Sequence, residues 1–135
     1  MMNNFIFQNA TKVYFGKDCV KEYLGSLTEP YSTVLLAYGG GSAKRNGIYD
    51  EVTGILKANG KKIVEFSGIM ANPTYAKVQE GAKLVREYDA DMILGIGGGS
   101  VMDCCKAVSL AARYDGDIWD DFWAKPGVIG TEPVP

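Results

Sequence analysis

The sequence predicts an α/β protein with a Rossmann-like parallel sheet and helices on both faces of that sheet. Three short apolar runs, at 33–38, 61–66 and 91–96, alternate with segments of helical periodicity. Continuous apolar runs are typical of strands buried on both faces, and their alternation with helices is typical of parallel sheets. Two of these runs also end in the same short motif, YGGGS from Tyr38 and IGGGS from Ile96.

The elements up to the second strand follow in order. Phe5–Gln8 and Lys12–Phe15, rich in aromatic and β-branched residues around Asn9-Ala10, predict an N-terminal β-hairpin. A short helix that ends before Pro30 is indicated by apolar residues at i, i+4 and i+7, namely Val20, Leu24 and Leu27. After the strand 33–38, a second helix is predicted from the stripe Ile48, Val52, Ile55 and Leu56, and it is closed by Asn59-Gly60.

Two further helices follow the strands 61–66 and 91–96. Pro73 is predicted as the first helical residue of one, whose apolar face consists of Tyr75, Val78, Ala82 and Val85. The other is predicted to begin at Ser100, with a core-facing stripe of Val101, Cys105, Val108 and Ala112. Both glycine turns then lie at the carboxyl edge of the sheet, where open α/β sheets bind ligands.

Composition excludes several classes of protein. The 135 residues fit one domain, and a net charge of -2 with 47% hydrophobic residues argues against a nucleic-acid partner. The start of the chain lacks a signal-peptide pattern, and no apolar run approaches the ~20 residues of a membrane span. The three cysteines, Cys19, Cys104 and Cys105, lack metal-ligand spacing and are interpreted as buried thiols of a cytoplasmic protein. The chain has no histidine, which excludes a histidine-based catalytic triad or zinc site within it.

The second glycine turn has the chemistry of a phosphate site. Glycines let ligand oxygens approach the backbone, and the amides at the start of the following helix carry a partial positive charge. Ser100 is predicted to cap that helix, with Asp103 completing an S-x-x-D capping pattern. The turn therefore predicts a pyrophosphate site, although Gly95-x-Gly97-x-x-Ser100 departs from the usual dinucleotide fingerprint.

A purely structural interpretation stays open beside this one. The glycines can serve close helix–sheet packing, and Asp103 can be a helix cap that pairs with Lys106. Two matched turns at one edge of the sheet favour ligand binding over packing alone.

The segment NPTYAKVQEGAKLVREYDADMILGIGGGSVMDCCKAV, 72–108, resembles the N-terminal domain of the iron-containing (group III) alcohol dehydrogenases, in particular the butanol dehydrogenase branch. TKVYFGKD at 11–18 and YGGGSAKRNGIYDEV at 38–52 resemble the same branch. The resemblance covers nearly the whole chain and implies a dehydroquinate synthase-like fold for this domain. It further implies an enzyme that moves hydride between NAD(P)H and an alcohol–aldehyde pair.

The resemblance also implies cofactor contacts, residue by residue. Gly98, Gly99 and Ser100 match the pyrophosphate-binding turn of the family. Asp103 matches an aspartate expected near the nicotinamide, and Asn72 matches a cofactor-contacting asparagine. The turn beside the adenine ribose is matched by Gly39, Gly40 and Ser42. No catalytic residue and no metal ligand of the family is matched in this chain.

The family pattern continues beyond the end of this sequence. The expected organisation is a dinucleotide-binding α/β domain at 1–125 and an interdomain connection at a truncated end, 126–135. An all-helical domain that holds Fe, Zn or another divalent metal through one aspartate and three histidines is expected to follow. The chain alone is therefore expected to be inactive, and the full-length protein is expected to be a cytoplasmic homodimer.

The first turn also predicts the choice of cofactor. An acidic side chain there holds the ribose 2′-hydroxyl and repels a 2′-phosphate, whereas this turn has glycines followed by Ser42, Lys44 and Arg45. The sequence favours NADP(H) over NAD(H), although Lys44 and Arg45 can also be ordinary solvated charges. The aromatic group Ile118, Trp119, Phe122 and Trp123 is interpreted as packing in the core or at a domain interface. The alternative function is a self-contained, non-catalytic nucleotide- or phosphate-binding module.

Overall fold

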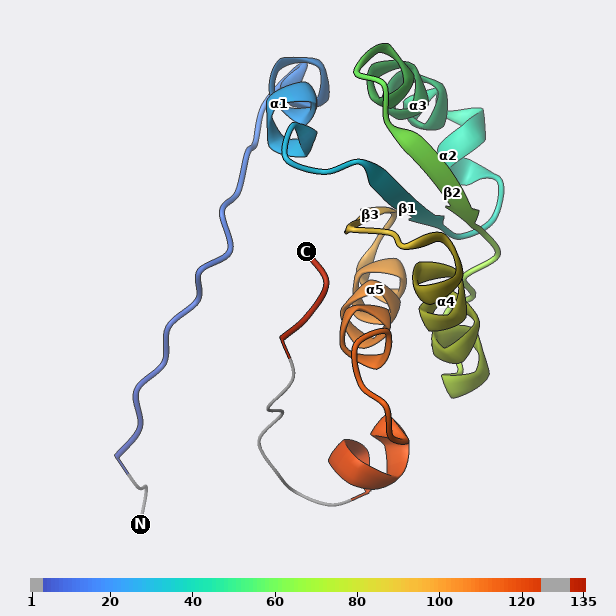
Figure 1. Cartoon of the computed structure of the whole chain (residues 1–135). Coiled ribbons are helices and arrows are strands. Elements are labelled where there is room, and N and C mark those ends of the chain that lie inside the picture. The colour runs from blue at the N-terminus through green and yellow to red at the C-terminus, as the bar shows by residue number, and fades with distance from the viewer. Residues whose placement is uncertain (1–3, 125–131) are drawn as a thin grey trace.

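The computed structural model describes residues 4–124 and 132–135 (Figure 1). Helices and strands alternate along the chain as the sequence predicts. In chain order they are α1 (Cys19–Thr28), β1 (Thr33–Tyr38), α2 (Ser42–Arg45), α3 (Ile48–Ala58), β2 (Lys62–Phe66), α4 (Tyr75–Tyr88), β3 (Met92–Ile96), α5 (Gly99–Ala111) and the short π-helix η1 (Trp119–Trp123).

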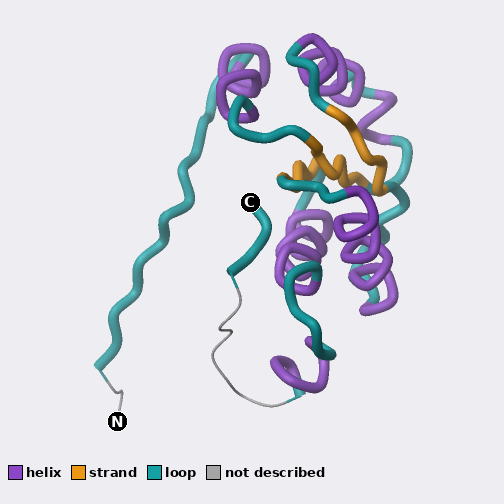
Figure 2. Tube along the Cα trace, in the orientation of Figure 1, coloured by secondary structure: helices purple, strands orange, loops and turns teal. Residues whose placement is uncertain are grey.

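The three strands form a parallel sheet in the order β2-β1-β3, and Figure 2 shows them together in orange at the centre of the molecule. Strand β1 pairs with β2 from Thr33↔Lys62 onward and with β3 up to Tyr38↔Ile96. Its residues from Val34 to Ala37 are completely buried, because β1 has a neighbour on each side and helices over both faces. The predicted α/β class and its parallel sheet are confirmed.

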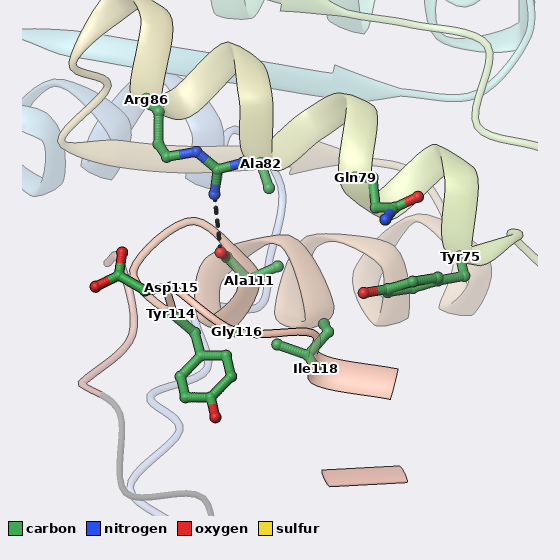
Figure 3. A pocket seen from close by; sticks show the side chains of 9 residues that line it. All are labelled: Tyr75, Gln79, Ala82, Arg86, Ala111, Tyr114, Asp115, Gly116 and Ile118. Atoms are coloured by element: carbon green, nitrogen blue, oxygen red, sulfur yellow. Dashed lines mark hydrogen bonds between the residues drawn. The ribbon is translucent and has the colours of Figure 1, made fainter. Parts of the chain in front are cut away.

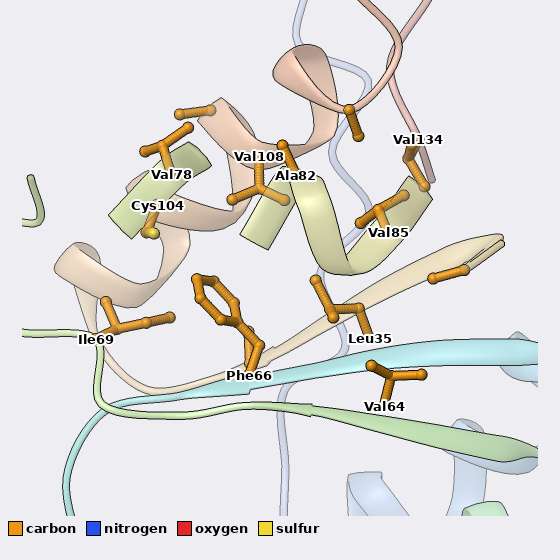
Figure 4. Close-up of a cluster of buried hydrophobic side chains, with 14 of the residues drawn as sticks. Leu35, Val64, Phe66, Ile69, Val78, Ala82, Val85, Cys104, Val108 and Val134 are labelled. Carbon is orange, nitrogen blue, oxygen red and sulfur yellow. The ribbon is translucent and has the colours of Figure 1, made fainter. Parts of the chain in front are cut away.

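Side chains of β1 alternate between two hydrophobic cores. Val34, Leu36 and Tyr38 enter the core beneath α1 and α3, whereas Leu35 and Ala37 enter the core beneath α4 and α5. Period-two alternation along a strand sends successive side chains to opposite faces. Figure 4 shows the second core, where the Phe66 ring lies among aliphatic side chains from the sheet and from both helices.

Three helix predictions need correction in detail. Helix α4 begins at Tyr75 rather than Pro73, because the Thr74 side chain accepts the amide of Lys77 and so caps the helix. Helix α5 begins at Gly99, with Gly98 as its N-cap residue. Cys104 rather than Cys105 is the more deeply buried thiol, since α5 turns Val101, Cys104 and Val108 toward the sheet.

The predicted N-terminal hairpin is absent from the structure. Residues 4–15 form neither strand nor helix and run away from the body of the molecule (Figure 1). Their apolar side chains lie in solvent, with Ile6 99% and Phe15 98% exposed. A two-stranded hairpin is marginal unless its apolar face packs on something, and these residues have no core to pack against.

The connection predicted at 126–135 lies partly outside the described residues. Residues 132–135 are described, and Val134 is buried in the core beneath α4 and α5. The Ile93 amide donates to the carbonyl oxygen of Pro135 at 2.7 Å, so the last residue lies beside β3. None of the helices among residues 4–124 is both long and apolar enough to cross a membrane.

Gly81 gives a test of this packing. A Cβ atom at this position of α4 lies 2.7 Å from Val108 Cγ2 and 2.8 Å from Phe66 Cε1. We therefore expect Gly81→Ala to lower the free energy of unfolding by about 1–3 kcal/mol, measured by urea denaturation.

The matched control is Gly54→Ala on the exposed face of α3, where no described atom lies within 4 Å of the added Cβ. This variant is expected to gain about 0.4–1 kcal/mol, because alanine restricts the unfolded chain. Equal stabilisation of the two variants contradicts the close contact of α4 with the sheet.

Candidate functional site

The two glycine turns lie next to one another at the carboxyl edge of the sheet. Tyr38 is paired with Ile96, so the residues that follow them, Gly39 and Gly97, leave adjacent strand ends. The connections from these two ends lead to opposite sides, one toward β2 and one toward α5. This is the topological switch point at which open α/β sheets form a ligand crevice.

The glycines of the second turn fall into two kinds. A Cβ on Gly97 lies 2.5 Å from Val101 Cγ2, so Gly97 is needed for the close approach of α5 to the end of β3. Around Gly98 and Gly99, no atom of the described residues lies within 4 Å of an added Cβ. Packing therefore explains Gly97 but leaves Gly98 and Gly99 facing open space.

The start of α5 presents backbone donors to that open space. The first intrahelical hydrogen bond runs from the Met102 amide to the Gly98 carbonyl at 3.1 Å, so the amides of Gly99, Ser100 and Val101 precede it. Such amides carry the positive end of the helix dipole and suit an anion. Within the described chain no side chain caps this helix start, so the predicted capping role of Ser100 is wrong.

Asp103 lies on α5, and Asn72 lies shortly before α4. The Asp103 carboxylate is exposed and lies 3.9 Å from the Lys106 ammonium. It lines a cavity of about 460 Å³ together with Pro73, the neighbour of Asn72. Asn72 is exposed in the loop between β2 and α4 and has a left-handed backbone, with φ of 52°. The loop and the outer face of α5 thus meet at this cavity.

Three aromatic rings also line that cavity, together with Val78, Cys104 and Ala107. Trp119 and Trp123 of η1 are each 53% exposed and surround it with Tyr75, at ring-centroid separations of 6.0 to 6.4 Å. Ile118 is buried and Phe122 packs against the core, so the predicted packing role holds for these two residues.

The first turn is held by the loop that follows β2. Gly68 donates to the Gly39 carbonyl at 3.0 Å, and Ile69 donates to the Tyr38 carbonyl at 3.3 Å. Gly39 itself is tightly packed, since an added Cβ lies 3.1 Å from the Ile69 carbonyl oxygen. Gly40 faces open space among the described residues, and Ser42 begins α2 directly after the turn.

The two cations after this turn differ in position. Arg45 Nη1 lies 2.6 Å from the place of a Cβ on Gly41, so its guanidinium covers the turn. The Lys44 ammonium instead lies over the Tyr49 ring, 4.7 Å from its centroid. Of the two, only Arg45 has its charged group against the turn.

Sequence reasoning missed Glu65, whose carboxylate accepts the hydroxyls of both Tyr38 and Tyr49. The hydrogen bond to Glu65, with burial, raises the pKa of Tyr49 to about 12. Burial and the same carboxylate raise the pKa of Tyr38. A single carboxylate inside the apolar run of β2 is the one signal in the sequence that marks this position.

Comparison with known proteins identifies the family. Residues 10–135 match the family model described as "Iron-containing alcohol dehydrogenase". The chain belongs to the iron-containing alcohol dehydrogenase family. Among curated relatives of the chain, a probable NADH-dependent butanol dehydrogenase 2 of Bacillus subtilis is 49% identical over 92% of the chain and 32% of its own length. The NADPH-dependent aldehyde reductase YqhD of Escherichia coli is 39% identical over 87% of the chain and 30% of its own length.

Solved structures give the same result. An NADH-dependent butanol dehydrogenase A from Thermotoga maritima superposes with a TM-score of 0.88 at 42% identity, over 99% of this chain and 33% of that one. The cofactor-free form of YqhD from E. coli superposes with a TM-score of 0.83 at 36% identity, over 98% and 34%. The chain therefore spans about a third of the length of the relatives it matches.

The described part of the chain holds no group of three His, Cys, Asp or Glu side chains close enough to bind a metal ion. Its cysteines are free, and burial raises the pKa of Cys104 and raises that of Cys105 to about 12. Thiols with raised pKa values stay protonated and are poor metal ligands and nucleophiles.

A second cavity, of about 270 Å³, lies between α4 and the segment after α5 (Figure 3). Arg86 crosses it and donates to the Ala111 carbonyl at 3.0 Å, which satisfies the last turn of α5. None of the eight predicted cofactor residues lines this cavity. The candidate site is therefore the edge formed by the two glycine turns.

Substitutions at Gly97 and Gly98 distinguish a packing role of the second turn from a binding role. We expect Gly97→Ala to lower the free energy of unfolding by about 1–3 kcal/mol in urea denaturation, since its Cβ enters Val101. Gly98→Ala, at the next residue and in open space, is expected to change the free energy of unfolding by less than about 0.5 kcal/mol. Destabilisation of similar size in both variants means that the whole turn serves packing.

Proposed function

We propose that this chain is the cofactor-binding part of an NAD(P)H- and metal-dependent alcohol dehydrogenase that interconverts primary alcohols of the butanol type with aldehydes. The main support is the pair of open glycines, Gly98 and Gly99, at the uncapped start of α5. Family membership agrees with this function, since relatives of this chain are named as NADH- and NADPH-dependent dehydrogenases and reductases. It favours the enzyme over the alternative, a self-contained phosphate-binding module.

Each predicted residue has a role in this proposal. The amides that follow Gly98 and Gly99, including that of Ser100, hold the pyrophosphate. Gly39, Gly40 and Ser42 lie against the adenine ribose, and Asn72 and Asp103 border the nicotinamide end. When bound, the nicotinamide supplies the hydride chemistry, whereas this chain binds and orients it.

The metal belongs to the part of the relatives' length that this chain does not cover. Within the proposed full-length protein, residues 1–125 form the cofactor domain and 126–135 connect it to a metal-holding helical domain. A divalent metal such as Fe or Zn there polarises the alcohol oxygen. We further propose that the full-length protein is a cytoplasmic homodimer.

For the choice between cofactors, we propose that NADP(H) is favoured over NAD(H). Residues 39–46 include no acidic side chain to repel a 2′-phosphate, and the Arg45 guanidinium covers Gly41. An arginine suits a phosphate through paired, charge-assisted hydrogen bonds.

Titration of the chain with NADPH and with NADH, followed by nicotinamide fluorescence, tests the site. We expect saturable binding with tighter affinity for NADPH, and loss of at least about tenfold in affinity in Gly99→Val, whose side chain fills the space for the pyrophosphate. The control is Gly54→Val, a substitution in equally open space on α3. Unchanged binding in Gly99→Val rules out the turn as the dinucleotide site, and tighter binding of NADH reverses the cofactor preference.

The chain alone is expected to give no turnover. Purified chain mixed with NADPH or NADH and butanal, with Fe²⁺ or Zn²⁺ added, should oxidise the cofactor no faster than a mixture without protein. The reason is that its described residues bring together no metal-binding group of side chains. Sustained cofactor oxidation that scales with protein concentration contradicts this division of roles.

A further inference from the structure

Four side chains from four elements meet beside the first glycine turn. Glu65 of β2 accepts the Tyr38 hydroxyl on one carboxylate oxygen and the Tyr49 hydroxyl on the other. The two tyrosine rings lie nearly edge to face with centroids 5.3 Å apart. The Lys44 ammonium of α2 lies 5.4 Å from the Tyr38 centroid and 4.7 Å from that of Tyr49. We call these four residues the Glu65 cluster.

The Glu65 cluster closes the base of the segment that carries the turn. Residues 39–48 leave the sheet after Tyr38 and come back to the cluster at Tyr49, the second residue of α3. Both ends of this segment are therefore bound to one carboxylate. Lys44, in the middle of the segment, folds back over the same two rings. The Tyr38 and Tyr49 hydroxyls thus tie both ends of this segment to β2, and Lys44 packs on the two tyrosine rings.

The chemistry of the Glu65 cluster strengthens these contacts. Hydrogen bonds to a carboxylate are stronger than those between neutral groups. The raised pKa values of Tyr38 and Tyr49 keep both hydroxyls protonated, so both donate at neutral pH. Lys44 balances the carboxylate charge through the faces of the rings, which limits the repulsion that an unpaired Glu65 exerts on an anionic ligand at the turn.

We propose that Glu65 is a positioning residue that holds the Gly39–Ser42 turn in the geometry that receives the ribose end of the dinucleotide. It acts through Tyr38, directly before the turn, and through Tyr49, at the start of α3. The identity of the ligand rests on the proposed function, whereas the restraint on the turn does not.

The test compares Glu65→Gln and Tyr49→Phe with the wild-type chain. The matched control is Tyr114→Phe, which removes a 2.8 Å tyrosine–carboxylate hydrogen bond to Asp121 away from the turn. Hydrogen exchange of the Arg45 and Asn46 amides, which donate to the carbonyls of Gly41 and Ser42, reports on the turn itself. Titrations with ADP and with inorganic pyrophosphate separate the adenosine end from the start of α5, and urea denaturation measures global stability.

We expect exchange of the Arg45 and Asn46 amides to become about tenfold faster in Glu65→Gln and Tyr49→Phe, and the ADP affinity to fall about five- to tenfold. Pyrophosphate affinity and all values for Tyr114→Phe should stay unchanged. Unchanged exchange and ADP binding in both cluster variants overturn the proposal. A parallel loss of ADP affinity, pyrophosphate affinity and global stability also overturns it, because Glu65 then serves the fold as a whole. If the wild-type chain binds neither ADP nor pyrophosphate but exchange still accelerates, the restraint stands and the proposed function fails.

Discussion

The pairing of β1 with two parallel neighbours is the constraint on which the rest of the structure depends. Because β1 is central and buried on both faces, its side chains must supply two cores, and helices must cover both faces of the sheet. The same pairing ends with Tyr38 level with Ile96. Two turns far apart in the sequence are thereby forced to adjacent positions, and a single extended ligand can reach both.

The glycines at this edge show why a glycine-rich turn needs to be examined residue by residue. No larger residue fits at Gly97 or Gly39 without a shift, because Val101 and the Ile69 carbonyl lie where a side chain would begin. Gly40, Gly98 and Gly99 meet no described atom at that distance. Packing therefore explains some glycines of each turn and leaves their neighbours in the sequence facing open space. The sequence alone shows two equivalent runs of glycine and does not separate these roles.

Sequence patterns predicted the features that depend on neighbouring residues in the chain. They missed the features that depend on tertiary contacts. The strand Thr33–Tyr38 matches its prediction residue for residue, because a six-residue apolar run between turn signals has one reasonable conformation. The N-terminal hairpin was wrong, because aromatic residues such as Phe5 and Phe15 favour strands only where a partner and a core exist. Helix α4 begins after Thr74 rather than at Pro73, because the Thr74 hydroxyl accepts a hydrogen bond from the Lys77 amide. Glu65 was missed because its partners Tyr38 and Tyr49 become neighbours only after β1, β2 and α3 have packed.

The character of the candidate site also explains how a chain without histidine can contribute to an oxidoreductase. The donors at the start of α5 are backbone amides, and these do not titrate near neutral pH. The tyrosines of the Glu65 cluster stay protonated in the same range, since the pKa of Tyr49 is raised to about 12. These protein groups therefore keep one protonation state near neutral pH.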